Sequence, residues 1–225
     1  MTIAYRDIVD ADAALALALR DPSGEWTIEH VEVGGNVGWD PAMAVDARGM
    51  IHLAYPSLNS SDDLRYARGR PGDWSIETVE QEGRVGQATA VAIDPSGAVH
   101  LAYHGYNSKG YGREVRYATN AGGGWRIESL GEGSLDESTR IAVDTLGRVH
   151  MVYLIWGTGL RHAVRTAQGW AAESIADKGV EGPWIDGFDM KLVFGALHVV
   201  YSSSTGLYYA RLPLAVDQDC DGEDD

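Results

Sequence analysis

Four histidines recur along the chain at one place in a repeated pattern: His52, His100, His150 and His198. Three of them follow an aspartate by six residues, namely Asp46, Asp94 and Asp144. Imidazole is a common ligand for zinc and copper, so the set suggests metal chemistry. Equal spacing, however, puts each histidine in a different repeat, and equivalent residues of a repeat need not converge. We therefore predict that the histidines are half-buried strand residues that satisfy a neighbouring repeat and that the aspartates accept backbone N–H groups at tight turns.

The length of the repeat can be read from a tyrosine that stands at the end of each copy of the pattern. These tyrosines are Tyr5, Tyr55, Tyr103, Tyr153 and Tyr201, so the steps are 50, 48, 50 and 48 residues. A fixed period of this size indicates a repeat architecture. The repeats cover about residues 1–33, 34–81, 82–131, 132–178 and 179–212.

Each repeat contains four short runs rich in Val, Ile, Tyr and Trp, bounded by Gly, Pro, Asp and Asn. In the second repeat they are residues 42–46, 51–55, 64–68 and 74–79. Such runs predict four strands, a to d, in an antiparallel meander. Repeated four-stranded units without helices favour an all-β fold, a β-propeller of about five blades.

Aromatic and acidic residues also recur in the last strand of each repeat. A tryptophan opens that strand in four repeats, and a glutamate follows it by three residues: Trp26 and Glu29, Trp74 and Glu77, Trp125 and Glu128, Trp170 and Glu173. Because they repeat, we predict that the tryptophans pack between blades and that the glutamates belong to the scaffold.

The two ends of the chain are incomplete in complementary ways. Residues 1–33 supply strands b, c and d, whereas residues 179–212 supply a, b and c. Residues 11–19 favour helix by propensity, but their place in the repeat predicts strand c. Residues 214–217 echo strand a of the second repeat, so we expect segment 213–225 to hold a strand that closes the ring, followed by an acidic tail. The alternative is a fragment of a larger ring.

Composition excludes several partners. The chain has 33 acidic and 18 basic residues and a net charge of −15, which opposes binding to nucleic acid and to anionic membranes. No apolar stretch reaches the length of a membrane-spanning helix. Residues 1–5 read as a strand rather than a signal peptide. We expect a secreted or cell-surface protein whose export signal is missing from this sequence, with the cytoplasm as the alternative.

The blade motif resembles that of a known family. The order Asp-x-x-Gly-x-x-His-x-x-Tyr, followed by Leu-Arg-Tyr-Ala and Gly-x-Trp, is similar to the blade signature of sialidase-like, BNR-type propellers of bacterial secreted proteins. The resemblance covers residues 1 to about 211 and implies a propeller fold. Sialidases carry Ser-x-Asp-x-Gly-x-x-Trp, where residues 21–26 here read Asp-Pro-Ser-Gly-Glu-Trp.

Residues that break the repeat are the better candidates for function, because one asymmetric ligand needs distinct groups. The long b–c and d–a connections emerge on one side of a propeller, so we expect the site there. Exposed aromatic rings can stack on a sugar, and neighbouring amides can bind its hydroxyl groups. The candidate ligand-binding residues are Trp39, Gln87, His104, Tyr106, Asn107, Tyr111, Trp156 and Trp184.

The same loops support a catalytic function less well than a binding function, and we assign no catalytic residue. A glycosidase needs two carboxylates near each other. Those in suitable loops are Asp40, Asp136, Glu137, Glu181 and Asp186, and the arginines there are Arg6, Arg84 and Arg140. We predict a non-enzymatic binding or assembly module for a glycan or a partner protein. The alternatives are a sialidase-like glycoside hydrolase and a structural subunit that forms oligomers by completing blades between chains.

The acidic tail has carboxylates at alternate positions followed by glycine, a spacing that turns oxygens towards calcium. The candidate ligands are Asp217, Asp219, Asp221 and Asp224. The segment resembles the calcium loops of thrombospondin type 3 repeats and the Asp-x-Asp-Cys-Asp-Gly motif of myxobacterial secreted proteins, which implies a weak calcium site. The alternative is a disordered acidic tail. We expect Cys220, the single cysteine, to pair outside this segment rather than act as a nucleophile.

Overall fold

The computed structural model describes residues 1–58, 62–81, 83–106, 113–132, 139–155, 158–177 and 185–214. Within them the chain forms five antiparallel sheets that follow one another in sequence. The first sheet is β1 (Thr2–Val9), β2 (Asp12–Arg20) and β3 (Trp26–Val33); the second is β4 (Ala42–Val45), β5 (Ile51–Ser57), β6 (Asp63–Arg70) and β7 (Asp73–Glu80). The third is β8 (Val85–Ile93), β9 (Val99–Tyr106), β10 (Arg113–Thr119) and β11 (Arg126–Glu132). The fourth is β12 (Thr139–Val143), β13 (Val149–Ile155), β14 (Gly159–Thr166) and β15 (Gly169–Asp177), and the fifth is β16 (Ile185–Val193), β17 (Ala196–Ser203) and β18 (Gly206–Pro213).

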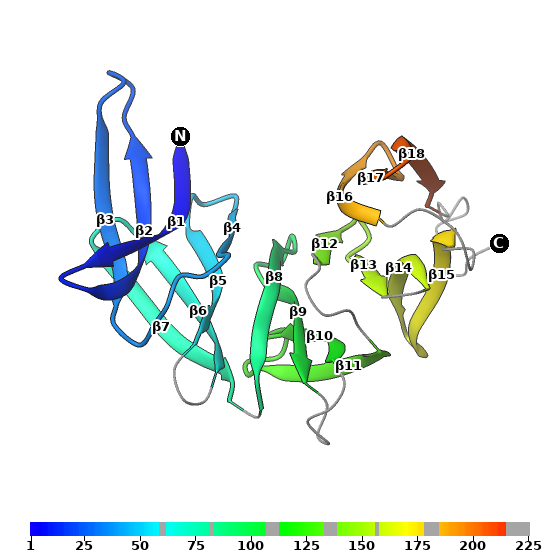
Figure 1. Ribbon diagram of the computed structural model, residues 1–225, viewed down its shortest axis with the longest axis horizontal. Coiled ribbons are helices and arrows are strands. Elements are labelled where there is room, and N and C mark those ends of the chain that lie inside the picture. The colour runs from blue at the N-terminus through cyan, green and yellow to red at the C-terminus, as the bar shows by residue number, and fades with distance from the viewer. Residues whose placement is uncertain are drawn as a thin grey trace.

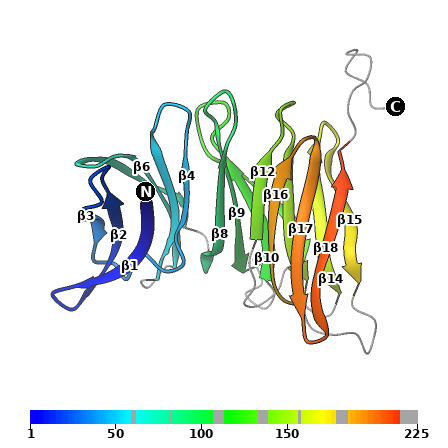
Figure 2. The same cartoon turned by 90° about the horizontal axis from the view of Figure 1, so that it is seen from above.

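Every sheet is a meander in which sequence neighbours pair, as the repeat predicted. The five sheets lie along an arc, with β4, β8, β12 and β16 on its inner side and β7, β11 and β15 on its outer side (Figure 1). Seen from above, the sheets stand face against face in a row (Figure 2). The helix-like segment 11–19 lies in strand β2, as its repeat position predicted, and its Leu15 and Leu17 side chains are buried in a cluster with residues of the second sheet.

The repeated aspartates and histidines belong to the scaffold, as predicted, but three of the histidines are buried rather than half-buried, and their partners lie in their own sheet rather than in a neighbouring one. The Asp46 carboxylate accepts the backbone N–H groups of Arg48 and Met50, and Asp94 accepts that of Ala98. The histidines bond a residue on the neighbouring strand of their own sheet: His52 Nδ1 lies 2.5 Å from the Tyr66 hydroxyl. They therefore link strands within sheets instead of gathering at one centre.

Replacing Asp94 with Ala should lower the free energy of unfolding by about 2 kcal/mol, because the turn loses the charge-assisted hydrogen bonds of this partly buried carboxylate. Asp94 accepts the Ser96 hydroxyl as well as the Ala98 amide, and lies 3.4 Å from His100. Urea denaturation measures the loss. Asp73→Ala, an exposed site with the same change in charge, is the control, and equal effects of the two substitutions would contradict the prediction.

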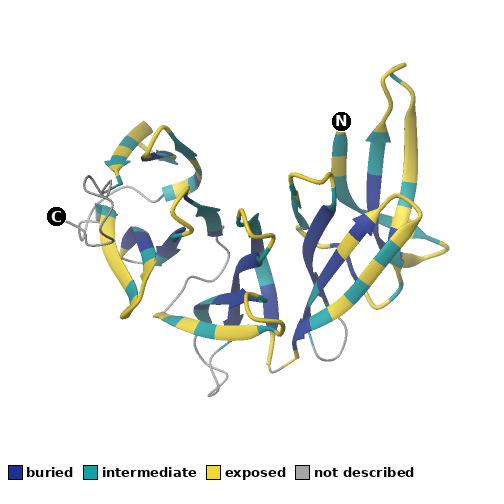
Figure 3. Cartoon of the chain, turned by 180° about the vertical axis from the view of Figure 1, so that it is seen from behind, coloured by how far each residue is buried: buried dark blue, intermediate teal, exposed yellow. Residues whose placement is uncertain are grey.

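Apolar clusters join each sheet to the next, and Trp74, Trp125 and Trp170 lie at these junctions as predicted, whereas Trp26 of the first sheet is 43% exposed. Trp125 of the third sheet packs edge-on against Tyr66 of the second at 5.3 Å, and Trp170 of the fourth against Tyr117 of the third at 5.1 Å. The Trp170 indole donates to Glu128 at 2.9 Å. Figure 3 shows buried residues concentrated in the middle strands of the sheets.

The first and fifth sheets have three strands each and lie at opposite ends of the arc (Figure 1). The Leu214 amide donates to the Gly195 carbonyl, so Leu214 extends the fifth sheet. Residues 215–225, which hold the rest of the expected closing strand, lie outside the described residues. Closure of the ring therefore stays a prediction. No helix among the described residues is long and apolar enough to cross a membrane.

Candidate functional site

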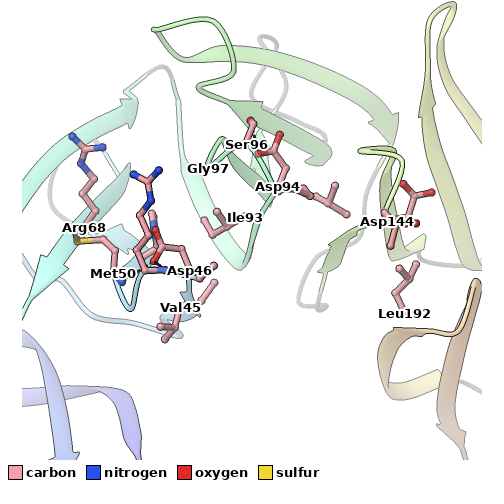
Figure 4. A pocket seen from close by; sticks show the side chains of 17 residues that line it. Val45, Asp46, Met50, Arg68, Ile93, Asp94, Ser96, Gly97, Asp144 and Leu192 are labelled. Carbon is pink, nitrogen blue, oxygen red and sulfur yellow. Dashed lines mark hydrogen bonds and ion pairs between the residues drawn. The ribbon is translucent and has the colours of Figure 1, made fainter.

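Two hollows open at opposite ends of the inner strands. The larger, of about 600 Å³, lies on the turn face, the side that carries tight turns such as 46–50. Figure 4 shows Asp46, Asp94 and Asp144 around it, with Val45 and Leu192 at its rim. The sequence prediction missed this hollow because it is built from repeated turn residues. The carboxylates of these three aspartates already accept hydrogen bonds from neighbouring side chains and backbone N–H groups. Those hydrogen bonds hold the pKa of each carboxylate below its usual value.

The smaller hollow, of about 340 Å³, lies on the loop face, the opposite side, which carries the connections between sheets and between the second and third strands of the four-stranded sheets. Asp40, Thr89 and Arg140 are among the residues lining it. Pockets of this size suit a small ligand or one sugar unit. Sequence reasoning placed function on this side, and two clusters of repeat-breaking side chains flank the hollow.

A glycine fixes the loop on each side of this hollow. Gly38 has φ +84°, and an added Cβ would lie 2.6 Å from the backbone oxygen of Ala14. Gly86 takes the equivalent place in the next repeat with φ +86°. These glycines let the chain pass close to the preceding sheet and direct the next residue, Trp39 or Gln87, to the loop face.

Replacing Gly38 with Ala should destabilise the protein by about 3 kcal/mol, because the substitution combines left-handed backbone strain with a clash against fixed backbone. Gly49→Ala is the matched control, since Gly49 has φ +75° but its Cβ would meet nothing within 4 Å. We expect about 1 kcal/mol for that variant. Urea denaturation compares the two, and equal losses would show that the close approach to Ala14 is unimportant.

Arg6, Asn36 and Trp39 form the first cluster, between the first and second sheets. The Arg6 guanidinium carbon lies 4.1 Å from the centre of the Trp39 ring. The Trp39 indole donates to the Asn36 side-chain oxygen at 3.0 Å, and Arg6 donates to the same oxygen at 3.4 Å. Trp39 is 44% exposed. The Arg6 Nε atom is buried and has no acceptor among the described residues.

Arg84, Gln87, Tyr106 and Arg113 form the second cluster, between the second and third sheets. The Tyr106 ring lies near two guanidinium groups, 5.5 Å from that of Arg84 and 5.1 Å from that of Arg113. Arg113 donates to the Gln87 side-chain oxygen at 2.6 Å and to the Tyr106 hydroxyl at 3.3 Å. Its Nε atom is also buried, with no acceptor in the described part of the chain.

The guanidinium groups of the loop-face arginines have two kinds of hydrogen-bond partner, carboxylates and neutral groups. Arg84 donates to Asp62 at 2.6 Å, which raises the pKa of its guanidinium, and Arg140 donates to Asp189 at 2.7 Å. Arg6 and Arg113 instead donate to amide and hydroxyl oxygens. An arginine that is held in place by neutral groups keeps its charge for a further acceptor.

The structure brings together three of the predicted ligand-binding residues. Gln87, His104 and Tyr106 lie at one junction, where Gln87 pairs with His104 in register and Arg113 bonds both Gln87 and Tyr106. His104 is 1% exposed, so it presents almost no surface to a ligand. Trp39 lies one junction away. Asn107, Tyr111, Trp156 and Trp184, and the predicted metal ligands Asp217, Asp219, Asp221 and Asp224, lie outside the described residues.

Sequence reasoning missed Arg113. It opens strand β10 at the place where Asp62 stands in the second repeat, so a basic residue replaces an acidic one in the repeat. That reversal of charge was the available signal. Among the candidate carboxylates, Asp40 lines the loop-face hollow and Asp186 is exposed on β16, while Asp136, Glu137 and Glu181 fall in undescribed segments.

Comparison with solved structures identifies the architecture. The chain is similar to an α-L-arabinofuranosidase of Fusarium graminearum at a TM-score of 0.62 and 13% identity, over 94% of this chain and 71% of that one. It is similar to a mutant lectin of Aleuria aurantia in complex with Fucα1-6GlcNAc at 0.61 and 15%, over 94% and 71%. The fold is a β-propeller.

A third similar propeller is the intramolecular trans-sialidase of Ruminococcus gnavus, at a TM-score of 0.56 and 13% identity over 89% of this chain. This propeller chain spans only 50% of that enzyme and 71% of the other two proteins. No protein-family model and no curated protein matches the sequence. At these sequence identities the structural similarity establishes the fold alone, so the activity has to be inferred from the residues of the site.

Proposed function

We propose that this propeller is a non-enzymatic glycan-binding module whose sugar sites are the two loop-face clusters. The observation that carries the proposal is the local environment of the Arg6 and Arg113 guanidinium groups. Each stacks near an aromatic ring, is held by a neutral amide, and keeps a buried Nε–H without an acceptor among the described residues. Buried donors are normally satisfied, so such a donor favours a bound acceptor.

Each cluster contains the three kinds of group that hold a sugar. The ring of Trp39 or Tyr106 offers a face for the apolar side of a pyranose. The guanidinium supplies planar donors for hydroxyl or carboxylate oxygens. Asn36 and Gln87 add amide groups beside them. The similarity to a fucose-bound lectin is compatible with this chemistry but rests on the fold alone.

A glycan array that contains neutral fucosylated glycans and uronate-containing glycans tests the proposal, with calorimetry on the retained compounds. We expect saturable binding with a Kd of about 1 mM or tighter, weakened in Arg113→Gln. Leu146→Ala, an exposed substitution on the turn face, is the control and should bind normally. Running the array with and without calcium tests the proposed tail site. Absence of retention for every glycan class would reject the proposal and favour a protein ligand.

A glycoside hydrolase is the second candidate, because Asp40 lines the loop-face hollow and two of the similar propellers are glycoside-processing enzymes. Hydrolysis would require a second carboxylate near Asp40. A panel of fluorogenic glycosides separates the two functions. Turnover that is lost in Asp40→Asn while binding persists would establish catalysis, and no turnover alongside binding supports the module.

A further inference from the structure

The contact between neighbouring sheets is the same at successive junctions and has two distinct halves. The forward half, which a sheet offers to the next, centres on two large residues of the strand before its last one in the complete sheets and of the equivalent strand β2 in the first: Leu64 and Tyr66 in the second sheet, Val115 and Tyr117 in the third, and Leu15 and Leu17 in the first. The backward half, offered to the preceding sheet, includes a leucine of the second strand and the opening tryptophan and isoleucine of the last strand, such as Leu53, Trp74 and Ile76. Both halves are apolar and closely packed where they meet.

The first sheet exposes a complete backward half. By register with the second sheet, Ile3 corresponds to Leu53, Trp26 to Trp74 and Ile28 to Ile76. Leu53 is 0% exposed, whereas Ile3 is 42%, Trp26 43% and Ile28 61% exposed. A blade-contact surface is therefore open to solvent at this end of the arc, where strand β3 is largely exposed in Figure 3.

The fifth sheet exposes the forward half. Register places Leu207 at the position of Leu64 and Tyr209 at that of Tyr66. Leu64 and Tyr66 are 0% and 1% exposed, but Leu207 and Tyr209 are 75% and 60% exposed. The Tyr209 hydroxyl is 2.6 Å from His198 Nδ1, as Tyr66 is bonded to His52, so the ring is already held in its packing position.

We infer that these two surfaces bind each other between copies of the chain, the fifth sheet of one copy receiving the first sheet of another. The two surfaces are opposite halves of a contact that this protein already makes between its own sheets, and they lie at opposite ends of one arc (Figure 1). Apolar patches of this kind are rarely left open in soluble proteins. Since the halves differ, the contact is heterologous and forms a closed ring or an extended chain of copies.

Light scattering after size-exclusion chromatography of the wild-type chain, from about 1 μM to about 1 mM, tests the inference. The expected mass rises with concentration to at least twice the 24.3 kDa of one chain. Ile28→Lys and Leu207→Glu should each remain at the mass of one chain, because each places a charge in the contact. Phe194→Ala, a fully exposed residue at a turn of the fifth sheet, is the control and should associate like wild type.

The asymmetry of the contact allows a sharper measurement. An equimolar mixture of Ile28→Lys and Leu207→Glu should form one-to-one dimers, because the unaltered fifth sheet of the first variant meets the unaltered first sheet of the second. Both positions are exposed in the single chain, so circular dichroism should show unchanged folding. A wild-type mass fixed at one chain would overturn the inference and indicate that the surfaces are covered within a chain. Association that survives both single substitutions would overturn it as well.

Discussion

Replacing Trp39 and Tyr106 together with alanine is expected to weaken glycan binding about tenfold at each of the two clusters. Each substitution removes an aromatic surface from one cluster and also releases the arginine beside it, Arg6 or Arg113. Loss of a stacking ring commonly costs about 1–2 kcal/mol, so one substitution should weaken its own site about tenfold. Calorimetry with a glycan retained on the array measures the change.

The single variants distinguish two sites from one. If the clusters bind independently, Trp39→Ala and Tyr106→Ala should each leave one site of normal affinity and weaken the other about tenfold, and only the double variant should weaken both. Both residues are at least partly exposed, so the fold should be unaffected, and an unchanged urea midpoint verifies this. Normal affinity and stoichiometry in the double variant would place the glycan elsewhere, with the turn-face hollow as the next candidate.

Lowering the pH from 8 to 5 is expected to destabilise the folded chain steeply. Burial lowers the pKa of His52, His100 and His150 below the ordinary 6.5, and this outweighs the nearby aspartates, which raise it. The unfolded chain therefore takes up protons near pH 6.5 while the folded histidines stay neutral. The stability is fully present above pH 6.5 and falls as the pH drops through the lowered values, by at most about 4 kcal/mol per pH unit for three histidines.

Urea denaturation at pH 8, 7, 6 and 5 measures this slope. His100→Gln should flatten it by up to about a third, because His100, which faces Asp94, Arg165 and Tyr117, no longer titrates. His30→Gln is the control, since His30 is partly exposed and pairs with Asp7. The lowered pKa values of the repeated aspartates act only below 3.8, outside this range. A free energy of unfolding that does not change from pH 8 to pH 5 would contradict the prediction.

The repeat made most of the fold predictable. The spacing of the tyrosines set the register, so that even segment 11–19, which favours helix by composition, was assigned correctly as β2. The roles of Asp46 and His52 followed from their recurrence, since every sheet needs the same turn and the same link between strands. Exact strand ends were less predictable: β6 spans Asp63–Arg70 where 64–68 was expected, because pairing with its two neighbouring strands continues beyond both ends of the apolar run.

The candidate site was predictable only in outline. The choice of loop face followed from the lengths of the connections, and Trp39, Gln87 and Tyr106 followed from residue type. Sequence could not show that Arg113 reaches from strand β10 to Gln87 and Tyr106, because this contact depends on how two sheets meet. Nor could it reveal that His104 is buried, since its position in the chain resembles the start of a loop.

The apolar clusters described above have a consequence for how the molecule comes apart. Each cluster joins one sheet to its neighbour, so cooperativity spreads only between adjacent units, as in a one-dimensional array. The third sheet packs on both sides, whereas the first and fifth each pack on one in the single chain. Amide hydrogen exchange should therefore be slowest in β9 and β10 and become faster towards both ends, with local opening from the ends preceding global unfolding.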